Sequence, residues 1–300
     1  MSFSNEILWG SENLTAIESD FVSYDRCLKM LEIPQEAEEH RQNIIDTEWP
    51  NNGKVEFKNY SLKYRPDTEI VLDDLSFSIN NNEKIGVVGR TGAGKSTLCL
   101  ALCRIVEAYS GSIIIDGIDI GSIGLSDLRQ KITIIPQDPT LFDGTLRFNL
   151  DPEGTYSNSY LLELSKQALL ENLINRDEKG LDQAIEENGQ NLSSGEKQLI
   201  CICRAILKKN KIVLMDEATA NIDIKTEETI QNLIQDKFKD ATVITIAHRL
   251  NTIINSDRVL VLDKGKVCEF DNPQTLLEDP NSMFSSYVKC LKQDKNSSES

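Results

Sequence analysis

The apolar positions near the start of the chain repeat with a helical period. Within residues 1–48 the apolar residues alternate spacings of three and four, a heptad pattern that keeps one apolar stripe on one side of a helix. The stripe residues are Leu14, Ile17, Phe21, Tyr24, Leu28 and Leu31. Ile33-Pro34 predicts the end of this helix, because the residue before a proline avoids the helical conformation. Two interpretations stay open: the helix lies on its own domain, or it packs on helices that are not part of this chain.

A change of pattern after this helix marks a domain boundary. An acidic linker covers residues 36–48, and the turn-forming run Trp49-Pro50-Asn51-Asn52-Gly53 follows it. The end of the chain, from residue 293, is polar, and chain ends of this kind are commonly disordered. We therefore predict a helical extension and linker over residues 1–48, one domain over 49–290, and a disordered tail over 291–300.

From Lys54 onward the pattern predicts an α/β domain, because short runs rich in β-branched residues alternate with helical spacing. The predicted strands are 55–60, 84–88, 112–115, 132–135, 211–215 and 242–247. The last four are nearly continuously apolar, which predicts strands buried on both faces. Two further runs, 258–263 and 266–270, are joined by Lys264-Gly265 and predict a hairpin. Between Gln137 and Glu196 the apolar spacing becomes helical, which predicts a helical insertion; the example is Leu161, Leu164, Ala168 and Leu169.

The net charge limits the possible partners. The chain carries a formal charge of −16, with 27% charged and 39% apolar residues, which is ordinary for a soluble globular protein. This acidity argues against a general nucleic-acid binder and against a polybasic membrane-surface protein, since both need clustered Lys and Arg. No apolar run approaches the roughly 18 residues that span a bilayer, and the first residues lack the apolar core of a signal peptide. We expect that the chain does not enter a membrane by itself.

The charge is also unevenly distributed. Residues 1–50 hold 11 acidic and 3 basic residues, a net of −8 and half of the total. The segment from Lys84 to Arg104 contains two more basic residues, Arg90 and Lys95, and no acidic residue. A positive island in an acidic chain predicts an anionic ligand in that segment.

The seven cysteines have neither the number nor the spacing of a disulfide framework or a zinc site. Their count is odd and no signal peptide accompanies them. Zinc sites use Cys-x₂-Cys pairs or nearby histidines, whereas this chain has one Cys-x-Cys and only two histidines, His40 and His248. We interpret the cysteines as small buried apolar groups in a reducing compartment, with a metal site as the less favoured alternative.

A phosphate-binding motif follows the strand at 84–88. Gly89-Arg90-Thr91-Gly92-Ala93-Gly94-Lys95-Ser96 fits G-x-x-x-x-G-K-[ST], and the run from Thr97 that follows predicts a helix. The glycines let backbone N–H groups converge on phosphate oxygens, and the helix directs its N-terminus at them. Lys95 can reach the β- and γ-phosphates, and the Ser96 hydroxyl can ligate Mg²⁺. The flanking strand and the positive island disfavour the alternative, a Gly-rich turn without a ligand.

Two acids at the end of another predicted strand can complete the site. The apolar run 212–215 ends in Asp216 and Glu217. We predict that this strand lies beside the phosphate-loop strand, with both acids at its carboxyl end, where open α/β sheets bind ligands. Asp216 is suited to a Mg²⁺-linked water, and Glu217 can orient or deprotonate an attacking water. The alternative is a strand capped by solvated acids.

The order of the remaining motifs resembles one family, the ATP-binding-cassette (ABC) ATPases. Leu192-Ser193-Ser194-Gly195-Glu196 is similar to the family's LSGGQ signature, with serine for one glycine and glutamate for the usual glutamine. The other matches are Tyr64 for the adenine-stacking residue, Gln137 for the Q-loop, Ala220-Asn221-Ile222-Asp223 for the D-loop and His248 for the switch histidine. The resemblance covers about residues 54–277. It implies the fold of a P-loop NTPase, an ABC ATPase cassette with an antiparallel β subdomain and a helical insertion, here preceded by an N-terminal helix.

This resemblance also implies an activity and a set of site residues. The activity is that of an ATPase with ATP and Mg²⁺ as its cofactors, in which Lys95, Gln137, Glu217 and His248 act in hydrolysis. The implied Mg²⁺ ligands are Ser96, Gln137 and Asp216. The implied nucleotide contacts are Tyr64, Gly89, Arg90, Thr91, Gly92, Ala93, Gly94, Lys95, Ser96 and Thr97, with Ser193, Ser194, Gly195 and Glu196 facing the ATP of a second cassette in a head-to-tail dimer.

Three finer matches resemble the second nucleotide-binding domain of the C subfamily, the multidrug-resistance-associated type. They are residues 55–66, residues 142–152 and Trp49-Pro50. The implied function is ATP hydrolysis that powers transmembrane export. The implied partners are another nucleotide-binding domain and transmembrane domains, without nucleic acid, at the cytosolic face of a membrane.

The N-terminal helix then resembles the end of a last transmembrane helix, as if the chain were separated from the part that crosses the membrane. Two alternatives stay open. One is a regulatory cassette that gates a channel or receptor with little turnover. The other is a soluble, cytoplasmic ABC ATPase without a transport role, although this chain has neither the two cassettes nor the long coiled-coil inserts of such proteins.

Overall fold

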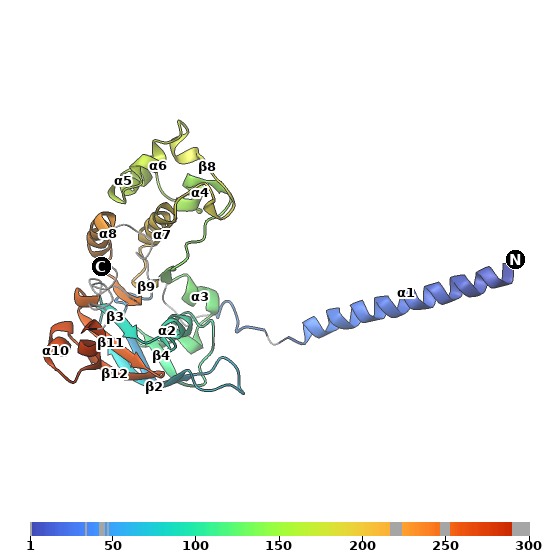
Figure 1. Ribbon diagram of the computed structural model, residues 1–300, viewed down its shortest axis with the longest axis horizontal. Helices are drawn as coiled ribbons and strands as arrows, with labels where there is room; N and C mark the ends of the chain where they lie inside the picture. The colour runs from blue at the N-terminus through green and yellow to red at the C-terminus, as the bar shows by residue number, and fades with distance from the viewer. Residues whose placement is uncertain are drawn as a thin grey trace, which may run out of the picture. The chain divides into compact units, whose positions relative to one another are not determined.

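The chain forms two units, of which the first is a single long helix. The computed structural model describes residues 2–33, 35–41, 46, 48–216, 224–246 and 253–289. The first unit ends at Glu38 and the second begins at Glu39. Helix α1 (Ser2–Leu31) confirms the helix predicted from the heptad pattern (Figure 1). All six residues of the predicted stripe, from Leu14 to Leu31, are exposed. Among the described residues of this unit, no second helix or strand is available to cover them.

Two sheets form the frame of the second unit (Figure 1). The first is antiparallel, with the strand order β2-β1-β4-β5. Its strands are β1 (Val55–Leu62), β2 (Leu72–Ile79), β4 (Ser110–Ile115) and β5 (Ile118–Asp119). The second has the order β12-β11-β3-β10-β9-β6 and is parallel except for β12. Its strands are β3 (Lys84–Gly89), β6 (Ile132–Ile135), β9 (Ile212–Asp216), β10 (Thr242–Ile246), β11 (Arg258–Asp263) and β12 (Lys266–Asp271).

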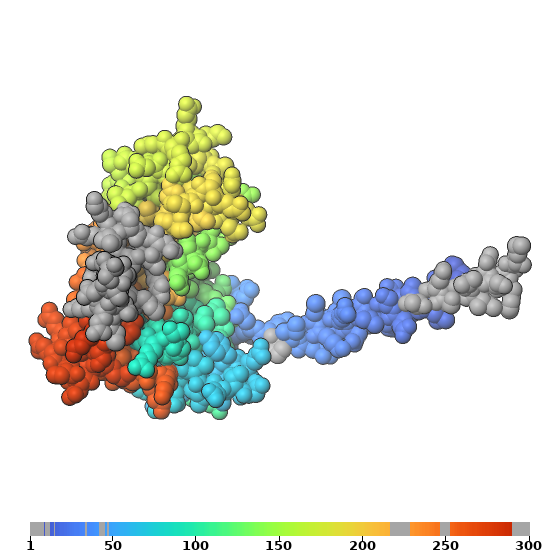
Figure 2. Space-filling view, viewed as in Figure 1, coloured from blue at the N-terminus to red at the C-terminus, as the bar shows by residue number. Residues whose placement is uncertain are grey.

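Helices connect and cover these strands. The elements are α2 (Lys95–Leu102), α3 (Leu125–Arg129), α4 (Leu146–Leu150), α5 (Asn158–Gln167), α6 (Glu171–Ile174), α7 (Ser194–Lys208), α8 (Ile224–Lys237) and α10 (Pro273–Glu278). Short 3₁₀ turns occur at Ile120–Ser122, Gly180–Asp182 and Glu187–Gly189, and a small sheet pairs β7 (Gly144–Thr145) with β8 (Ala184–Ile185). Residues 283–289 are also helical. The elements from α4 to α6 confirm the helical insertion predicted between Gln137 and Glu196, and α7 begins at its end and extends it to Lys208. Together they form one end of the second unit, in yellow and green, in Figure 2.

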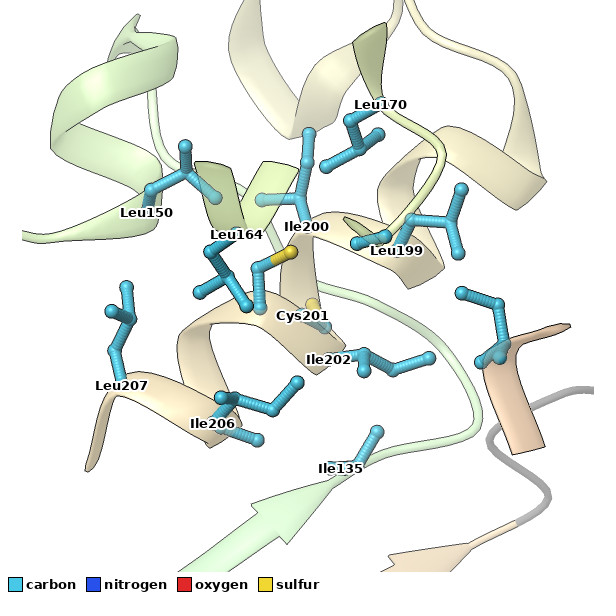
Figure 3. Packing of buried hydrophobic residues seen from close by; sticks show 14 of the residues in the cluster. Ile135, Leu150, Leu164, Leu170, Leu199, Ile200, Cys201, Ile202, Ile206 and Leu207 are labelled. Atoms are coloured by element: carbon cyan, nitrogen blue, oxygen red, sulfur yellow. The ribbon is translucent and has the colours of Figure 1, made fainter. Parts of the chain in front are cut away.

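Strand β9 shows how the parallel sheet organises two cores. Its side chains alternate between the two faces of the sheet. Val213 and Met215 belong to a cluster with the helical insertion, whereas Ile212 and Leu214 belong to a cluster with the antiparallel sheet and α2. Figure 3 shows the first cluster around α7, where Leu199, Ile200, Ile202 and Ile206 meet the helices of the insertion and Ile135 of β6. A strand covered on both faces has no polar side, which explains its continuous apolar run.

The prediction of burial on both faces is confirmed for β9 and β10 but wrong for two other strands. Strand β4 lies in the antiparallel sheet, and along the predicted run Ser112 and Ile114 are only half buried, whereas Ile113 and Ile115 are buried. Strand β6 is the last strand of its sheet, and Ile134 is half exposed. A run of isoleucines has the same appearance whether one or both faces are covered, so the pattern alone does not distinguish these cases.

The predicted neighbour of the phosphate-loop strand is also wrong. The strand that ends in Asp216, β9, does not pair with β3, because β10 lies between them and pairs with both. Hydrophobic patterning identifies buried parallel strands but contains no information on their order in a sheet. The carboxyl ends of all three strands still lie at one edge, as predicted.

Three smaller expectations also differ from the structure. Leu169 does not continue helix α5: it follows the helix end, with a positive φ of 59°, and is exposed. Strand β2, which contains Asp73 and Asp74, was not among the predicted strands. Cys27 and Cys268 are exposed, whereas Cys103, Cys201 and Cys203 are buried as expected. Burial raises the pKa of the Cys203 thiol to about 12, which keeps this thiol uncharged.

The segment at Trp49 closes the edge of the second unit. The indole of Trp49 is buried, and its Nε1 donates to the Ile115 carbonyl at 3.0 Å. The Asp116 carboxylate accepts hydrogen bonds from the backbone N–H groups of Asn52, Gly53 and Lys54 at 2.8, 3.0 and 2.8 Å. These bonds hold the turn-forming run against the end of β4.

Candidate functional site

The candidate site lies at the carboxyl edge of the parallel sheet. Across this sheet, Ile246 of β10 pairs with Val87 of β3 on one side and with Asp216 of β9 on the other. Met215 of β9 pairs with Ile135 of β6, and Gln137 follows two residues later. The register therefore brings the phosphate loop, Asp216 and Gln137 to the same edge. Ligands of open α/β sheets bind at this edge.

Three predicted elements fall outside the described residues. They are Glu217, which follows Asp216, the D-loop at 220–223, and His248, which comes two residues after the end of β10. Their predicted roles remain predictions.

The phosphate loop has the backbone that its glycines permit. Gly92 has a φ of +81° and Gly94, the N-cap of α2, has a φ of +101°, both in the left-handed region that favours glycine. A Cβ on Gly94 would lie 2.7 Å from a methyl carbon of Leu72, so this glycine also permits close packing. A Cβ on Gly92 would meet no atom within 4 Å. Gly92 thus leaves an open cradle at the N-terminus of α2, where a phosphate group fits.

The predicted lysine lies inside this loop. Lys95 is 8% exposed, and its Nζ donates to the carbonyl oxygens of Gly89 at 2.8 Å and Arg90 at 3.1 Å. The ammonium group is thereby kept next to the loop's backbone, where an arriving phosphate would compete for it. The neighbouring side chains differ in their exposure to solvent. Arg90, Thr91 and Ser96 are exposed, whereas Ala93 and Thr97 are buried.

Tyr64 is tied to the same helix. It follows the end of β1, is half exposed, and its Oη lies 2.9 Å from Oγ1 of Thr97 on α2. A half-exposed ring fixed by its hydroxyl has a free face for a flat ligand such as a purine base. The structure therefore brings the predicted base-stacking residue to the phosphate-loop helix.

The predicted Mg²⁺ ligands form a suitable donor set. Ser96 is exposed on the first turn of α2, Asp216 ends β9, and Gln137 lies two residues beyond the end of the adjacent strand β6. Hydroxyl, carboxylate and amide oxygens are the donors that Mg²⁺ prefers, with water and phosphate oxygens completing its shell. The residues present therefore fit this ion.

The signature-like segment forms the N-terminus of a different helix. Ser193 is the N-cap of α7 and makes a capping box with Glu196: Ser193 Oγ accepts from the Glu196 N–H at 3.2 Å, and Glu196 Oε2 accepts from the Ser193 N–H at 2.8 Å. Arg176 forms an ion pair with the same carboxylate. Helix α7 belongs to the insertion, apart from α2 (Figure 1). The chain therefore has two separate helix N-termini at its motif segments, one at Lys95 and one at Ser193.

The positive island is only partly a feature of this site. Arg90 and Lys95 lie at the phosphate loop, but Lys84 begins β3 at the opposite edge of the sheet, where its Nζ donates to the carbonyls of Asn82, Phe238 and Ala241. Arg104 is buried beyond the end of α2 and donates to the carbonyls of Ile120 and Ile123. Two of the four basic residues therefore stabilise the fold, and only two face the candidate ligand.

Sequence reasoning also missed contacts that depend on residues far apart in the chain. These are the hydrogen bond between Tyr64 and Thr97, the ion pair between Arg176 and Glu196, and the hydrogen bond from the buried Gln198 side chain on α7 to the Pro136 carbonyl. The motifs predict which residues matter but not which partners orient them.

Comparisons with known proteins agree with this geometry. Residues 72–220 match the family described as ABC transporter. The chain is 46% identical to "Bile pigment transporter 1" of Saccharomyces cerevisiae, over 97% of this chain and 20% of that protein. It is 45% identical to "ATP-binding cassette sub-family C member 2" of Homo sapiens, over 95% of this chain and 18% of that protein. The chain thus spans about a fifth of the length of these curated relatives.

A solved structure supports the same fold. The chain resembles the structure of a bacterial Atm1-family ABC exporter with ATP bound, with a TM-score of 0.80 and 31% identity, over 91% of this chain and 47% of that one. Within the described residues of the present chain, no helix is both long and apolar enough to cross a membrane. The strand order, the phosphate loop and the similarity to both groups lead to one conclusion: the chain belongs to the ABC-transporter family and contains a nucleotide-binding domain of the C-subfamily type, and domains of this kind bind and hydrolyse ATP.

Proposed function

We propose that this chain is the second nucleotide-binding domain of a C-subfamily exporter and that its hydrolysis of Mg·ATP powers the export of a solute across a membrane. One observation carries the proposal: a phosphate loop with a buried lysine, Asp216 and Gln137 meet at one edge of a parallel sheet. The names of two relatives, a bile pigment transporter and a "Metal resistance protein", both of Saccharomyces cerevisiae, support a transport role but do not identify this chain's solute.

The first step is ATP binding by this chain's own residues. The adenine would stack on the free face of Tyr64, while the phosphates would enter the cradle at Gly92 and replace the loop carbonyls as partners of Lys95. Ser96, Asp216 and Gln137 would hold Mg²⁺, which supplies positive charge to the β- and γ-phosphates when bound. Because these contacts lie at the ends of rigid elements, little reorganisation is needed when ATP enters.

The second step is attack of water on the γ-phosphate. Glu217 would orient that water and accept its proton, with His248 hydrogen-bonded to the γ-phosphate. Lys95 would stabilise the negative charge that moves to the bridging oxygen as the bond between the β- and γ-phosphates breaks. The products are ADP and inorganic phosphate.

The third step couples hydrolysis to movement. In a head-to-tail pair, the segment from Ser193 to Glu196 would face the ATP of the other domain, so ATP would hold the two domains together and hydrolysis would release them. Transmembrane domains attached to the pair would change conformation with each cycle. In such an arrangement the chain would lie at the cytosolic face of a membrane.

Two substitutions in the 300-residue chain test binding and chemistry separately. Lys95→Ala is expected to weaken ATP binding, measured by calorimetry, because it removes the charge that faces the phosphates. Glu217→Gln is expected to leave the affinity intact and to abolish phosphate release. If the wild-type chain binds ATP but releases no phosphate, either by itself or in the assembled transporter, this result would favour the regulatory alternative. Turnover of the Glu217→Gln chain at the wild-type rate would exclude Glu217 as the base.

A further inference from the structure

Helix α7 holds the segment that contains Gln137 at both of its ends. On one side, Nε2 of Gln198 donates to the Pro136 carbonyl at 3.1 Å. On the other side, Nη1 of Arg204 donates to the Thr140 carbonyl at 3.2 Å, and its Nε donates to the Asn149 carbonyl at 2.8 Å. Gln137 lies between these two anchor points. Any movement of α7 relative to the sheet therefore acts directly on the segment of Gln137.

Gln198 is an unusual residue for its surroundings. It is 1% exposed, and it is followed on α7 by the fully apolar run from Leu199 to Cys203 of the helical core (Figure 3). The carbonyl oxygen of Pro136 can only accept, so the contacting atom of Gln198 must be its amide nitrogen. This orientation leaves Oε1 of Gln198 buried, with no hydrogen-bond partner in the part of the chain that the structure describes. A buried polar atom without a partner destabilises the fold, and its presence in a core requires an explanation.

We propose that Gln198 is a positioning residue for ATP hydrolysis, which links the N-terminus of α7 at Ser193 to Gln137. Helix α7 is a rigid connection between these points, because it begins with a complete capping box and is buried from Gln198 to Leu207 except at the half-buried Arg204. Contact of Ser193 with a phosphate would shift α7, and Gln198 would pass that shift to Pro136 and Gln137. The unpaired Oε1 is then an acceptor available for a new partner in the shifted arrangement. This inference rests on the proposed function of Ser193 and Gln137.

The test is Gln198→Met in the 300-residue chain, with Ser165→Ala as the matched control. Methionine has a similar length and no polar atom, so the substitution removes both the bond to Pro136 and the unpaired oxygen. Ser165 lies on α5 in the same helical insertion, is 1% exposed, and also has a buried side-chain oxygen without a partner. Its position has no bond to the Gln137 segment among the described contacts, so Ser165→Ala removes an unpaired atom without breaking the link.

A positioning role predicts opposite changes in stability and turnover. The melting temperature of Gln198→Met should equal or exceed that of the wild type, the Kd for ATP should be unchanged, and kcat should fall about tenfold to a hundredfold. Ser165→Ala should keep the wild-type kcat. In a Gln137→Ala background, Gln198→Met should cause no further loss of kcat, because both changes act on one group.

Each other outcome overturns the proposal. A Gln198→Met chain that unfolds or melts lower, with kcat falling in proportion to the folded fraction, shows a structural residue only. If Gln198→Met lowers kcat by the same factor in the Gln137→Ala background as in the wild type, Gln198 does not act through Gln137.

Hydrogen exchange separates this proposal from the proposed function. In the nucleotide-free chain, Gln198→Met should speed exchange at the backbone amides of Gln137 and Asp138, and unchanged exchange there overturns the link even if the wild type has no turnover. A wild-type chain without ATP binding defeats the proposed function by itself.

Discussion

At the scale of single residues, the site depends on small contacts that orient the recognised motif residues. The hydroxyl of Tyr64 is bonded to Thr97, two residues after Lys95 on α2, so the ring and the phosphate loop share one support. The motif residues themselves could be predicted, because G-x-x-x-x-G-K-[ST] is a local pattern whose chemistry follows from its own spacing. The partner Thr97 could not be assigned to Tyr64, because 33 residues separate them and only the fold brings them together.

The ring of Tyr64, rather than its hydroxyl, should account for most of its contribution to ATP affinity. Tyr64→Ala is expected to weaken ATP binding by about 1–3 kcal/mol, the usual range for loss of a base–aromatic stack. Tyr64→Phe keeps the ring and loses one partly exposed hydrogen bond, so its loss should stay below about 1.5 kcal/mol. Calorimetric titration with ATP measures both. Tyr160→Ala, which removes a partly exposed ring on α5, should leave the affinity unchanged. Equal Kd values for Tyr64→Ala and the wild type would refute stacking.

Gly92 should matter for ligand binding as well as for stability. Gly92→Ala forces a non-glycine residue to a φ of +81°, which should lower the free energy of unfolding by about 1–2 kcal/mol, and its Cβ would also enter the open cradle. We expect the ATP affinity to fall about tenfold or more, equivalent to about 1.4 kcal/mol. The control is Gly117→Ala, between β4 and β5, where φ is +82° and a Cβ likewise meets nothing within 4 Å. Equal changes in affinity for both variants would show that the cradle is not the binding site.

At the scale of secondary-structure elements, the first residues of the second unit are fastened to the loop around α3. The Glu39 carbonyl accepts from the Ser126 N–H at 2.9 Å, and Nη1 of Arg41 donates to the Gly121 carbonyl at 3.2 Å. His40 Nδ1 lies 2.8 Å from an Asp127 carboxylate oxygen. The sequence shows only an acidic linker here, since no local pattern reveals that His40 has a partner 87 residues away. By contrast, elements with a strong local period, such as α5 and the hairpin at Lys264, could be predicted closely.

His40, which pairs with Asp127, should titrate above the ordinary pH range of histidine. The hydrogen bond to Asp127, together with the charge of its carboxylate, raises the pKa of His40, and the same bond lowers the pKa of Asp127. Stability from the histidine is full below pH of about 6.5 and is lost as pH rises through the raised pKa. Stability from the aspartate is lost only as pH falls through its lowered pKa. The contact should therefore be strongest between about pH 4 and 6.5.

NMR titration of the imidazole resonances can measure this shift, because the chain has only two histidines. The resonance that disappears in His40→Gln identifies His40. Its pKa should lie above 6.5 in the wild type and return to about 6.5 in Asp127→Asn. A pKa of His40 at or below 6.5 in the wild type would contradict the ion pair.

Gly124 should be needed for the close approach of the linker. A Cβ at this position would lie 2.4 Å from the Glu39 carbonyl oxygen and 2.7 Å from the His40 Cα, both backbone atoms. Gly124→Ala should therefore displace residues 39–40 and speed hydrogen exchange at the Ser126 amide, whose acceptor is lost. The amides of β9 and β10 should exchange at their wild-type rates. Unchanged exchange at Ser126 would show that the linker tolerates the methyl group.

At the scale of the whole molecule, the stability of the second unit comes from within that unit. Every buried apolar side chain in its three described clusters belongs to residue 49 or later, whereas the described apolar side chains of α1 are exposed. Composition and periodicity could predict an α/β domain after a helix, because each rests on local pattern. They could not predict that β10 separates β3 from β9, since strand order depends on how long connections cross the sheet.

Removal of residues 1–38 should leave the thermal stability of the cassette nearly unchanged. A loss of 1 kcal/mol would lower the melting temperature of a domain of this size by about 2–4 °C, and we expect a smaller shift, measured by calorimetry. As a control in the full chain, Trp49→Ala should cost about 3–5 kcal/mol, because it empties a buried indole site and leaves the Ile115 carbonyl without its donor. A large shift on removal of residues 1–38 would show that the helix contributes to the core.

The position of β10 between β3 and β9 also determines how the site responds to mutation. Adjacent strands lie about 4.8 Å apart, so the ends of β3 and β9 are held about 10 Å from each other by backbone hydrogen bonds alone. Side-chain substitutions within β10 leave this width unchanged, because the ladder does not depend on side-chain identity. Only the gain or loss of a whole strand would alter it. The distance between the phosphate loop and Asp216 should therefore tolerate substitutions in β10 well. The groups at the two ends of this distance remain sensitive to single-atom changes.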